Sequence, residues 1–209
     1  MYSSDKNLTI AEILAYRHCS DGFDALISEA REAEKASRLK EYSQLLGLIT
    51  RAGLSAPEKR NIAASELLKA AEGFTAGADA VTQRGGPYAW SKEHARVIGN
   101  NTLLLSICRC ASALGDREFA GPLMKIEAMP ELHGGYAPVL HEEKPEQTWE
   151  KEYALFPNDN IFLTFTRIKV LQAASACGSR EASEKLGEYR DHPISLIRRI
   201  AEKAGYPKS

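Results

Sequence analysis

The 209-residue chain has few of the features that mark specialised protein classes. Its four cysteines are Cys19, Cys108, Cys110 and Cys177, and none forms a CxxC pair, so neither a disulfide framework nor a cysteine-rich zinc site is predicted. No run approaches about 18 apolar residues, and Met1–Asn7 has no apolar segment, so neither a membrane-spanning helix nor a signal peptide is expected. We expect a soluble, cytoplasmic protein with reduced thiols.

A strong charge of one sign is also missing. The chain has 27 basic and 28 acidic residues, a net charge of −1. This balance excludes the global basicity of many nucleic-acid-binding proteins and leaves room only for a local basic patch. With 44% hydrophobic residues, the chain is long enough for one sizeable core, and we predict a single domain over residues 1–209.

Strand-like alternation is scarce, and helical periodicity dominates. Leu104, Cys108, Ala111 and Leu114 keep the spacing of one helical face. Capping boxes are predicted where Thr9 precedes Glu12 and Ser55 precedes Glu58. The pattern predicts helices over residues 10–18, 21–35, 38–52, 57–82, 91–114, 117–129, 160–177, 180–190 and 193–204.

An internal duplication organises the chain. Glycines that are expected to end helices lie 62 and 63 residues apart, at Gly53, Gly115 and Gly178. The segment Ala111–Glu118 reads ASALGDRE and returns as ASACGSRE at Ala174–Glu181. Repetition at a fixed period predicts stacked helical hairpins.

The duplicated unit resembles a HEAT-type repeat, the module of many α-solenoids. The resemblance depends on ACGSRE at Ala176–Glu181, on Leu186, and on the Asp and Pro that precede the hydrophobic-Arg helix in Asp191–Gly205. It implies a short right-handed α-solenoid of antiparallel hairpins, and an irregular helical bundle is the alternative. Residues 55–130 and 159–209 would be repeat units, after N-terminal helices over residues 1–54 and around an inserted loop over residues 131–158.

Two long connections are the predicted functional edge. If the three glycine turns lie at one end of the hairpins, Gln83–Trp90 and Pro130–Asp159 fall at the other end. Long loops on a helical scaffold are disproportionately functional, and aromatic residues anchor interfaces. The alternative is that these aromatic residues only cover the helix ends. The predicted partner-binding residues are Tyr88, Trp90, Tyr136, Glu142, Glu143, Glu146, Trp149 and Tyr153.

Charge divides the last third of the chain. Residues 131–159 hold seven acidic and two basic residues, a net charge of −5, whereas residues 160–209 hold nine basic and five acidic residues, a net charge of +4. An acidic aromatic loop suits a protein partner with a basic surface. The alternative is that the loop packs against the basic residues of its own domain.

Motifs for catalysis are weak. His141-Glu142-Glu143 begins like a zinc-protease helix, but Pro145 stands where a second His is required. Asp191-His192 is better explained if Asp191 caps the following helix. The motifs predict no enzyme, and we expect no cofactor and no metal site.

The sequence therefore favours a protein-binding module, such as an adaptor or a bacterial toxin-neutralising immunity protein, and no motif separates these two. The alternative is nucleic-acid binding, because some HEAT-like proteins are alkylpurine DNA glycosylases. Self-association through the terminal repeat is a third option. The residues that would serve nucleic-acid binding are Arg190, Arg198, Arg199 and Lys203.

Overall fold

The computed structural model describes residues 20–74, 92–129 and 161–204, and these residues form helices without any strand. The predicted all-α class is confirmed for this part of the chain. In chain order the α-helices are α2 (Ser20–Lys35), α3 (Leu39–Ser55), α4 (Pro57–Glu72), α6 (Lys92–Leu114), α7 (Ala120–Glu127), α9 (Ile161–Ala176), α10 (Arg180–Glu188) and α11 (Ser195–Ala204). Single 3-10 turns precede α7 at Arg117–Phe119 and follow α10 at Tyr189–Asp191.

Two of the three expected glycine turns end helices as predicted. Gly115 and Gly178 follow α6 and α9 with φ of +69° and +87°, the left-handed conformation that glycine adopts without steric cost. The amide of Gly115 donates to the carbonyl of Ala111, and the amide of Gly178 donates to that of Ser175. The duplicated ASALG and ASACG sequences therefore both end their helices at a left-handed glycine, although the Gly115 amide bonds four residues back and the Gly178 amide three.

Gly53 has a different role, and the predicted turn there is wrong. Helix α3 continues to Ser55, and the chain reverses at Ala56, which is extended, before Pro57 starts α4. A Cβ atom at Gly53 would lie 2.6 Å from the Cβ of Ala63, a separation that side chains do not reach. Glycine is needed here because α3 and α4 approach closely, and not because the backbone turns.

Two predicted caps are also wrong. The Ser55 hydroxyl donates to the Ala52 carbonyl within α3, and α4 has Ala56 at its N-cap position and no side-chain cap. At α11, the His192 ring accepts a hydrogen bond from the Ile194 amide, which places His192 and not Asp191 at the helix start. In contrast, Ser179 caps α10 by accepting from the Ala182 amide at 3.2 Å.

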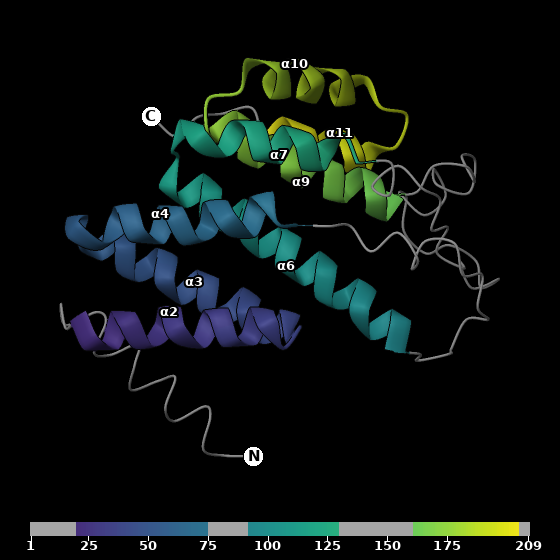
Figure 1. The fold of residues 1–209 in the computed structure, drawn as a ribbon. Helices are drawn as coiled ribbons and strands as arrows, with labels where there is room; N and C mark the ends of the chain where they lie inside the picture. Colours follow the sequence, from purple (N-terminus) through teal and green to yellow (C-terminus); the bar gives the residue numbers. More distant parts are fainter. Residues whose placement is uncertain (1–19, 75–91, 130–160, 205–209) are drawn as a thin grey trace.

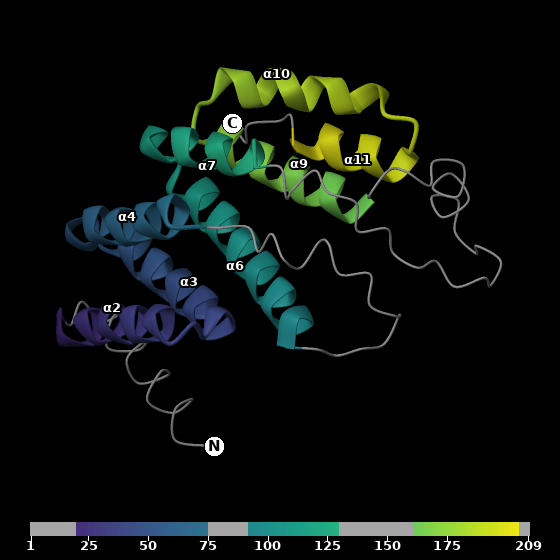
Figure 2. The same cartoon turned by 45° about the vertical axis from the view of Figure 1, so that its right-hand side comes forward.

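Helices α3, α6 and α9 pack side by side through the centre of the described structure. Helix α3 packs against α2, α4 and α6, whereas α9 packs against α6, α7, α10 and α11. Figures 1 and 2 show α2 at one end of the described structure and α10 at the other, with α3, α6 and α9 between them. The predicted helical core is thus shared among all of them, with Leu46, Ile107 and Leu171 fully buried.

Helices α3 and α6 run parallel. The Ser106 hydroxyl donates to the Ser43 carbonyl at 2.8 Å, and the Cys110 thiol donates to the Leu46 carbonyl at 3.8 Å. From the first bond to the second, the donor and the acceptor both move toward the C-terminal ends of their helices. The two bonded pairs are 63 and 64 residues apart in sequence. The Cys177 thiol, at the end of α9, donates to the Ala111 carbonyl near the end of α6, with a separation of 66 residues.

The helix turns lie along one edge. The Arg60 guanidinium, at the start of α4, donates to the Leu114 carbonyl at 2.5 Å and to Asp116 at 2.8 Å, so it joins the α3–α4 turn to the α6–α7 turn. The side chain of Arg117, in the α6–α7 turn, lies against Gly178 and so joins this turn to the α9–α10 turn. The described segments stop or resume at residues 74, 92, 129 and 161. These residues lie at the opposite ends of the helices from the turns, as Figure 1 shows.

Candidate binding groove

The partner-binding residues predicted from the sequence lie outside the described residues. All eight fall within residues 75–91 and 130–160, so the loop-edge hypothesis stays a prediction. The residues are Tyr88, Trp90, Tyr136, Glu142, Glu143, Glu146, Trp149 and Tyr153.

The basic residues proposed for nucleic acid have unequal roles. Arg198 donates to the carbonyls of His192 at 2.6 Å and Pro193 at 2.8 Å, which ties it to the start of its own helix. Arg190 and Arg199 are exposed, and the side chain of Lys203 lies outside the described part. One of the four predicted residues therefore serves the local fold.

Two other basic residues, on α9 and α10, also form ion pairs within the fold. Arg167 on α9 and Lys185 on α10 both donate to Glu127 on α7, at 2.7 and 3.0 Å. Glu127 is only 2% exposed, so the carboxylate of this ion-pair cluster is buried where three helices meet. These cations hold helices together, and their charge is not available to an external partner.

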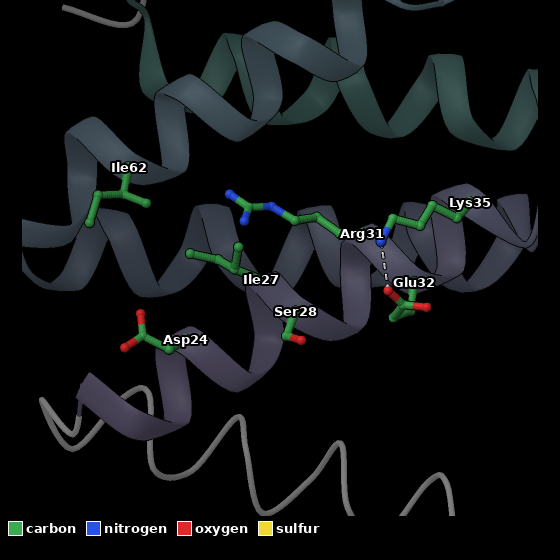
Figure 3. A pocket seen from close by; sticks show the side chains of 7 residues that line it. All are labelled: Asp24, Ile27, Ser28, Arg31, Glu32, Lys35 and Ile62. Atoms are coloured by element: carbon green, nitrogen blue, oxygen red, sulfur yellow. Dashed lines mark hydrogen bonds and ion pairs between the residues drawn. The ribbon is translucent and has the colours of Figure 1, made fainter.

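One surface hollow lies along α2, opposite Ile62 of α4, and encloses about 530 Å³. Figure 3 shows Asp24, Ser28 and Glu32 on α2 around it, with Lys35 paired to Glu32. Arg31, which also lines it, donates to Glu66 at 2.6 Å. Most of the charged groups here already have partners of opposite sign, so the hollow offers little to a ligand.

The second hollow lies between α3 and α6 and encloses about 610 Å³. We call it the α3–α6 groove. Helix α3 contributes seven residues between Gln44 and Leu54, and α6 contributes Arg109, Cys110 and Ala113. Leu54, at the end of the groove, is 45% exposed. Arg51 of α3 and Arg109 of α6 approach this largely apolar groove from opposite helices.

Arg109 lies across Gly47. A Cβ atom at Gly47 would lie 3.5 Å from the Nη2 atom of Arg109 and would meet no other atom within 4 Å. No hydrogen bond or ion pair joins Arg109 to another residue that the structure describes. An exposed guanidinium with unused donors therefore lies beside apolar groups of the groove.

Thr50 adds an unused polar group. Its residue lines the α3–α6 groove and is 3% exposed. Among the described residues, its Oγ1 atom is the single buried side-chain oxygen or nitrogen without a hydrogen-bond partner. The carbonyl four residues earlier, that of Leu46, already accepts from Cys110. A buried hydroxyl without a partner destabilises the fold.

Charge separates the helices into two groups. The described side chains of α3, α6 and α9 include five basic residues and one acidic residue, Glu41, which accepts from Arg38 at 2.7 Å. The described side chains of α2 include four acidic and two basic residues. The groove is therefore lined by helices with more basic than acidic described side chains, although α3 also packs against the acidic helix α2.

The described cysteines are free and buried, as the sequence indicates. Burial raises the pKa of the Cys108 thiol to about 12 and that of Cys177 to about 11, so both stay protonated at neutral pH. Within residues 20–74, 92–129 and 161–204 no three His, Cys, Asp or Glu residues form a metal-binding group. No helix in these ranges is both long and apolar enough to cross a membrane.

Comparison with known proteins gives no match: no family model, no curated protein and no solved structure matches the chain.

The groove was not predicted from the sequence, although two signals point to it. Gly47 interrupts an apolar helical run, and such a glycine in a helix often marks a close approach of another group. Arg109 is the single charged residue in the apolar stretch from Leu103 to Leu114. Neither signal shows that the two residues meet, because they are far apart in the chain.

We predict that Gly47→Ala stabilises the protein. The added methyl group makes ordinary contact with Arg109 alone, and alanine favours a helix interior over glycine by about 0.5–1 kcal/mol. Chemical denaturation should show a gain of that size with an unchanged denaturant dependence. A loss of stability would mean that the approach of α6 over Gly47 is closer than the structure shows.

A second prediction concerns acid. Glu66 accepts hydrogen bonds from Arg31 and Lys69, and these hold its pKa below the ordinary value of 4.5. Burial raises the pKa of Glu127, but the bonds from Arg167 and Lys185 outweigh this and leave its pKa lowered. A lowered pKa in the folded state gives stability that is present above about pH 4.5 and lost as the pH falls through the folded-state pKa.

The free energy of unfolding should therefore fall steeply below about pH 4.5. Replacing both residues, Glu66→Gln with Glu127→Gln, should lower stability at neutral pH and flatten this dependence. Glu72→Gln, at an exposed site of α4, is the matched control and should leave the profile of the native protein unchanged. An equally steep profile in the double variant would assign the acid sensitivity to other groups.

Proposed function

We propose that this protein is a protein-binding module built as a short α-solenoid. The observation that supports the solenoid is the parallel packing of α3 and α6, whose contacts join residues 63 and 64 positions apart. This separation matches the spacing of the duplicated sequence. In an up-and-down bundle neighbouring helices are antiparallel, whereas stacked hairpins place equivalent helices side by side and parallel.

A solenoid of this kind serves as a surface for partners. Each hairpin contacts only its neighbours, so the layer of equivalent helices presents a continuous open face. In this protein that layer contains the α3–α6 groove and carries an excess of basic residues. The loop edge predicted from the sequence, residues 83–90 and 130–159, would be a second contact surface at the ends of the same helices.

Nucleic acid is the second candidate partner, because α3, α6 and α9 carry five basic residues in their described parts. Against this, Arg167 is engaged with Glu127, and the Lys169 ammonium lies over the Phe165 ring at 5.3 Å from its centroid. The chemistry of the groove is also more apolar than phosphate binding requires. A protein partner is therefore favoured.

The test is capture of a partner by the immobilised full chain. We predict that one dominant protein is retained from a lysate of the native cells, and that Trp149→Ala with Tyr153→Ala removes it while the helical circular dichroism is unchanged. Ile62→Ala, which truncates an apolar residue 45% exposed on α4, is the control and should retain the partner. Retention by the double variant would remove the loop edge, and retention of mainly nucleic acid would favour the second candidate.

A further inference from the structure

We propose that the α3–α6 groove binds an acidic amphipathic helix of a protein partner. This rests on the proposed protein-binding function and deepens it by naming a surface and the chemistry of its occupant. Three properties of the groove carry the inference: its shape, its charge and the residue types along its walls.

The shape fits a helix. The groove runs between two parallel helices, and a third helix packs into such a groove by placing a row of its side chains between theirs. On α3 it extends from Gln44 to Leu54, which corresponds to roughly 15 Å along the helix axis. An occupant of about ten residues, or three helical turns, would fill this length.

The charge favours an acidic occupant. Arg109 projects to the groove from α6 with no hydrogen bond or ion pair to the described residues, and Arg51 lies on the α3 side. Among the side chains that the structure describes on α3, α6 and α9, one is acidic: that of Glu41, which is paired with Arg38. A carboxylate on the occupant would accept from Arg109 in a charge-assisted bond, the stronger class of hydrogen bond.

The lining excludes the other candidate occupants. Leu45, Leu48 and Ala113 give the groove an apolar floor, and none of the described residues that line it is aromatic, so this lining gives the bases of a nucleic acid nothing to stack on. The described helices of a second copy of this chain are poor occupants of the groove. Its acidic helix α2 has its apolar residues, Phe23 and Leu26 among them, already buried in its own core.

The experiment selects peptides against the purified full chain. A displayed library of random peptides of about 15 residues, roughly four helical turns, is enriched on the wild-type protein. The expected consensus has apolar residues at helical spacing with Asp or Glu between them. Fluorescence anisotropy then measures the dissociation constant of one such labelled peptide, and hydrogen exchange should show protection in α3 and α6.

Two variants locate the peptide. Arg109→Glu places a like charge against the acidic peptide and should weaken binding roughly 10-fold or more, since like-charge contacts are strongly unfavourable. Gly47→Leu adds a branched side chain at a groove position where its Cβ would meet Arg109 alone, and should weaken binding by a similar factor. The matched control is Arg199→Glu, an exposed arginine on α11, which should leave the dissociation constant within about 2-fold.

The outcomes are separable from those of the proposed function. Selected peptides without acidic residues, or peptides that bind Arg109→Glu and Gly47→Leu as tightly as wild type, would overturn the groove proposal. The proposed function would then still stand if a cellular protein is captured through Trp149 and Tyr153. Binding of a duplex oligonucleotide in place of peptides, weakened by Arg109→Glu, would assign the groove to nucleic acid and overturn this occupant.

Discussion

Arg167→Leu is expected to cost about 3 kcal/mol of unfolding free energy, and Glu127→Gln is expected to cost about half of that. The asymmetry follows from burial. The Glu127 side chain is 2% exposed, whereas those of Arg167 and Lys185 are 27% and 36% exposed. Removing Arg167 leaves a buried carboxylate with Lys185 as its remaining cation. Removing the carboxylate leaves two cations that water can reach.

Urea denaturation of the two variants measures this difference, and the chain supplies a control of equal bond length. Arg180 donates to Glu184 at 2.8 Å, close to the 2.7 Å of the Arg167 bond, but Arg180 is 92% exposed. Arg180→Leu should therefore cost less than about 1 kcal/mol, as exposed ion pairs do. If Glu127→Gln were as costly as Arg167→Leu, the cluster would act through hydrogen-bond geometry and not through the burial of charge.

The sequence predicted the helical class and several helix limits, because the signals for them are local. The predicted range 21–35 differs from α2 by one residue at its start, and 91–114 differs from α6 in the same way. The duplicated Gly115 and Gly178 were correctly read as helix ends. The range 57–82 was too long, since α4 ends at Glu72 and Gly73 is its cap. Gly73 is a signal for a helix end, but the apolar pattern that continues beyond it favoured the longer helix.

The misreading of Gly53 has a different cause. A glycine at a helix end is needed either for a left-handed backbone or for close packing, and the sequence shows the same residue in both cases. The regular spacing of 62 and 63 residues favoured the first interpretation. The second depends on Ala63, which belongs to another helix and whose distance from Gly53 is fixed by packing.

The ion pairs and the groove could not be predicted for the same reason. The ion pairs of Arg167 and Lys185 have no local signal in the sequence, because their partner Glu127 lies 40 and 58 residues away. The α3–α6 groove depends on the register of two helices separated by another hairpin element. Once the register near 63 residues is known, Arg109 falls beside Gly47, and an otherwise ordinary arginine becomes a candidate contact.

Gly53→Ala is expected to lower the unfolding free energy by roughly 2–3 kcal/mol, the range found when a well-packed site is overfilled. The new methyl carbon would lie 2.6 Å from that of Ala63, and the Arg60 backbone at 3.4 Å limits any shift. Helices α3 and α4 must then move apart. The same substitution at Gly47, in the same helix, should stabilise the protein, so opposite signs within one helix separate packing from helix propensity.

A double-mutant cycle tests whether Ala63 is the obstacle. Ala63→Gly alone should cost about 1–1.5 kcal/mol, from helix propensity and the lost burial of one methyl group. In the double variant the methyl group has only changed helices, so the losses of helix propensity and burial at residue 63 are largely offset at residue 53. The net loss should then stay below about 1 kcal/mol, well below the sum of the single effects. Additive losses would show that the strain of Gly53→Ala lies against the Arg60 and Lys59 backbone, which a change at Ala63 cannot relieve.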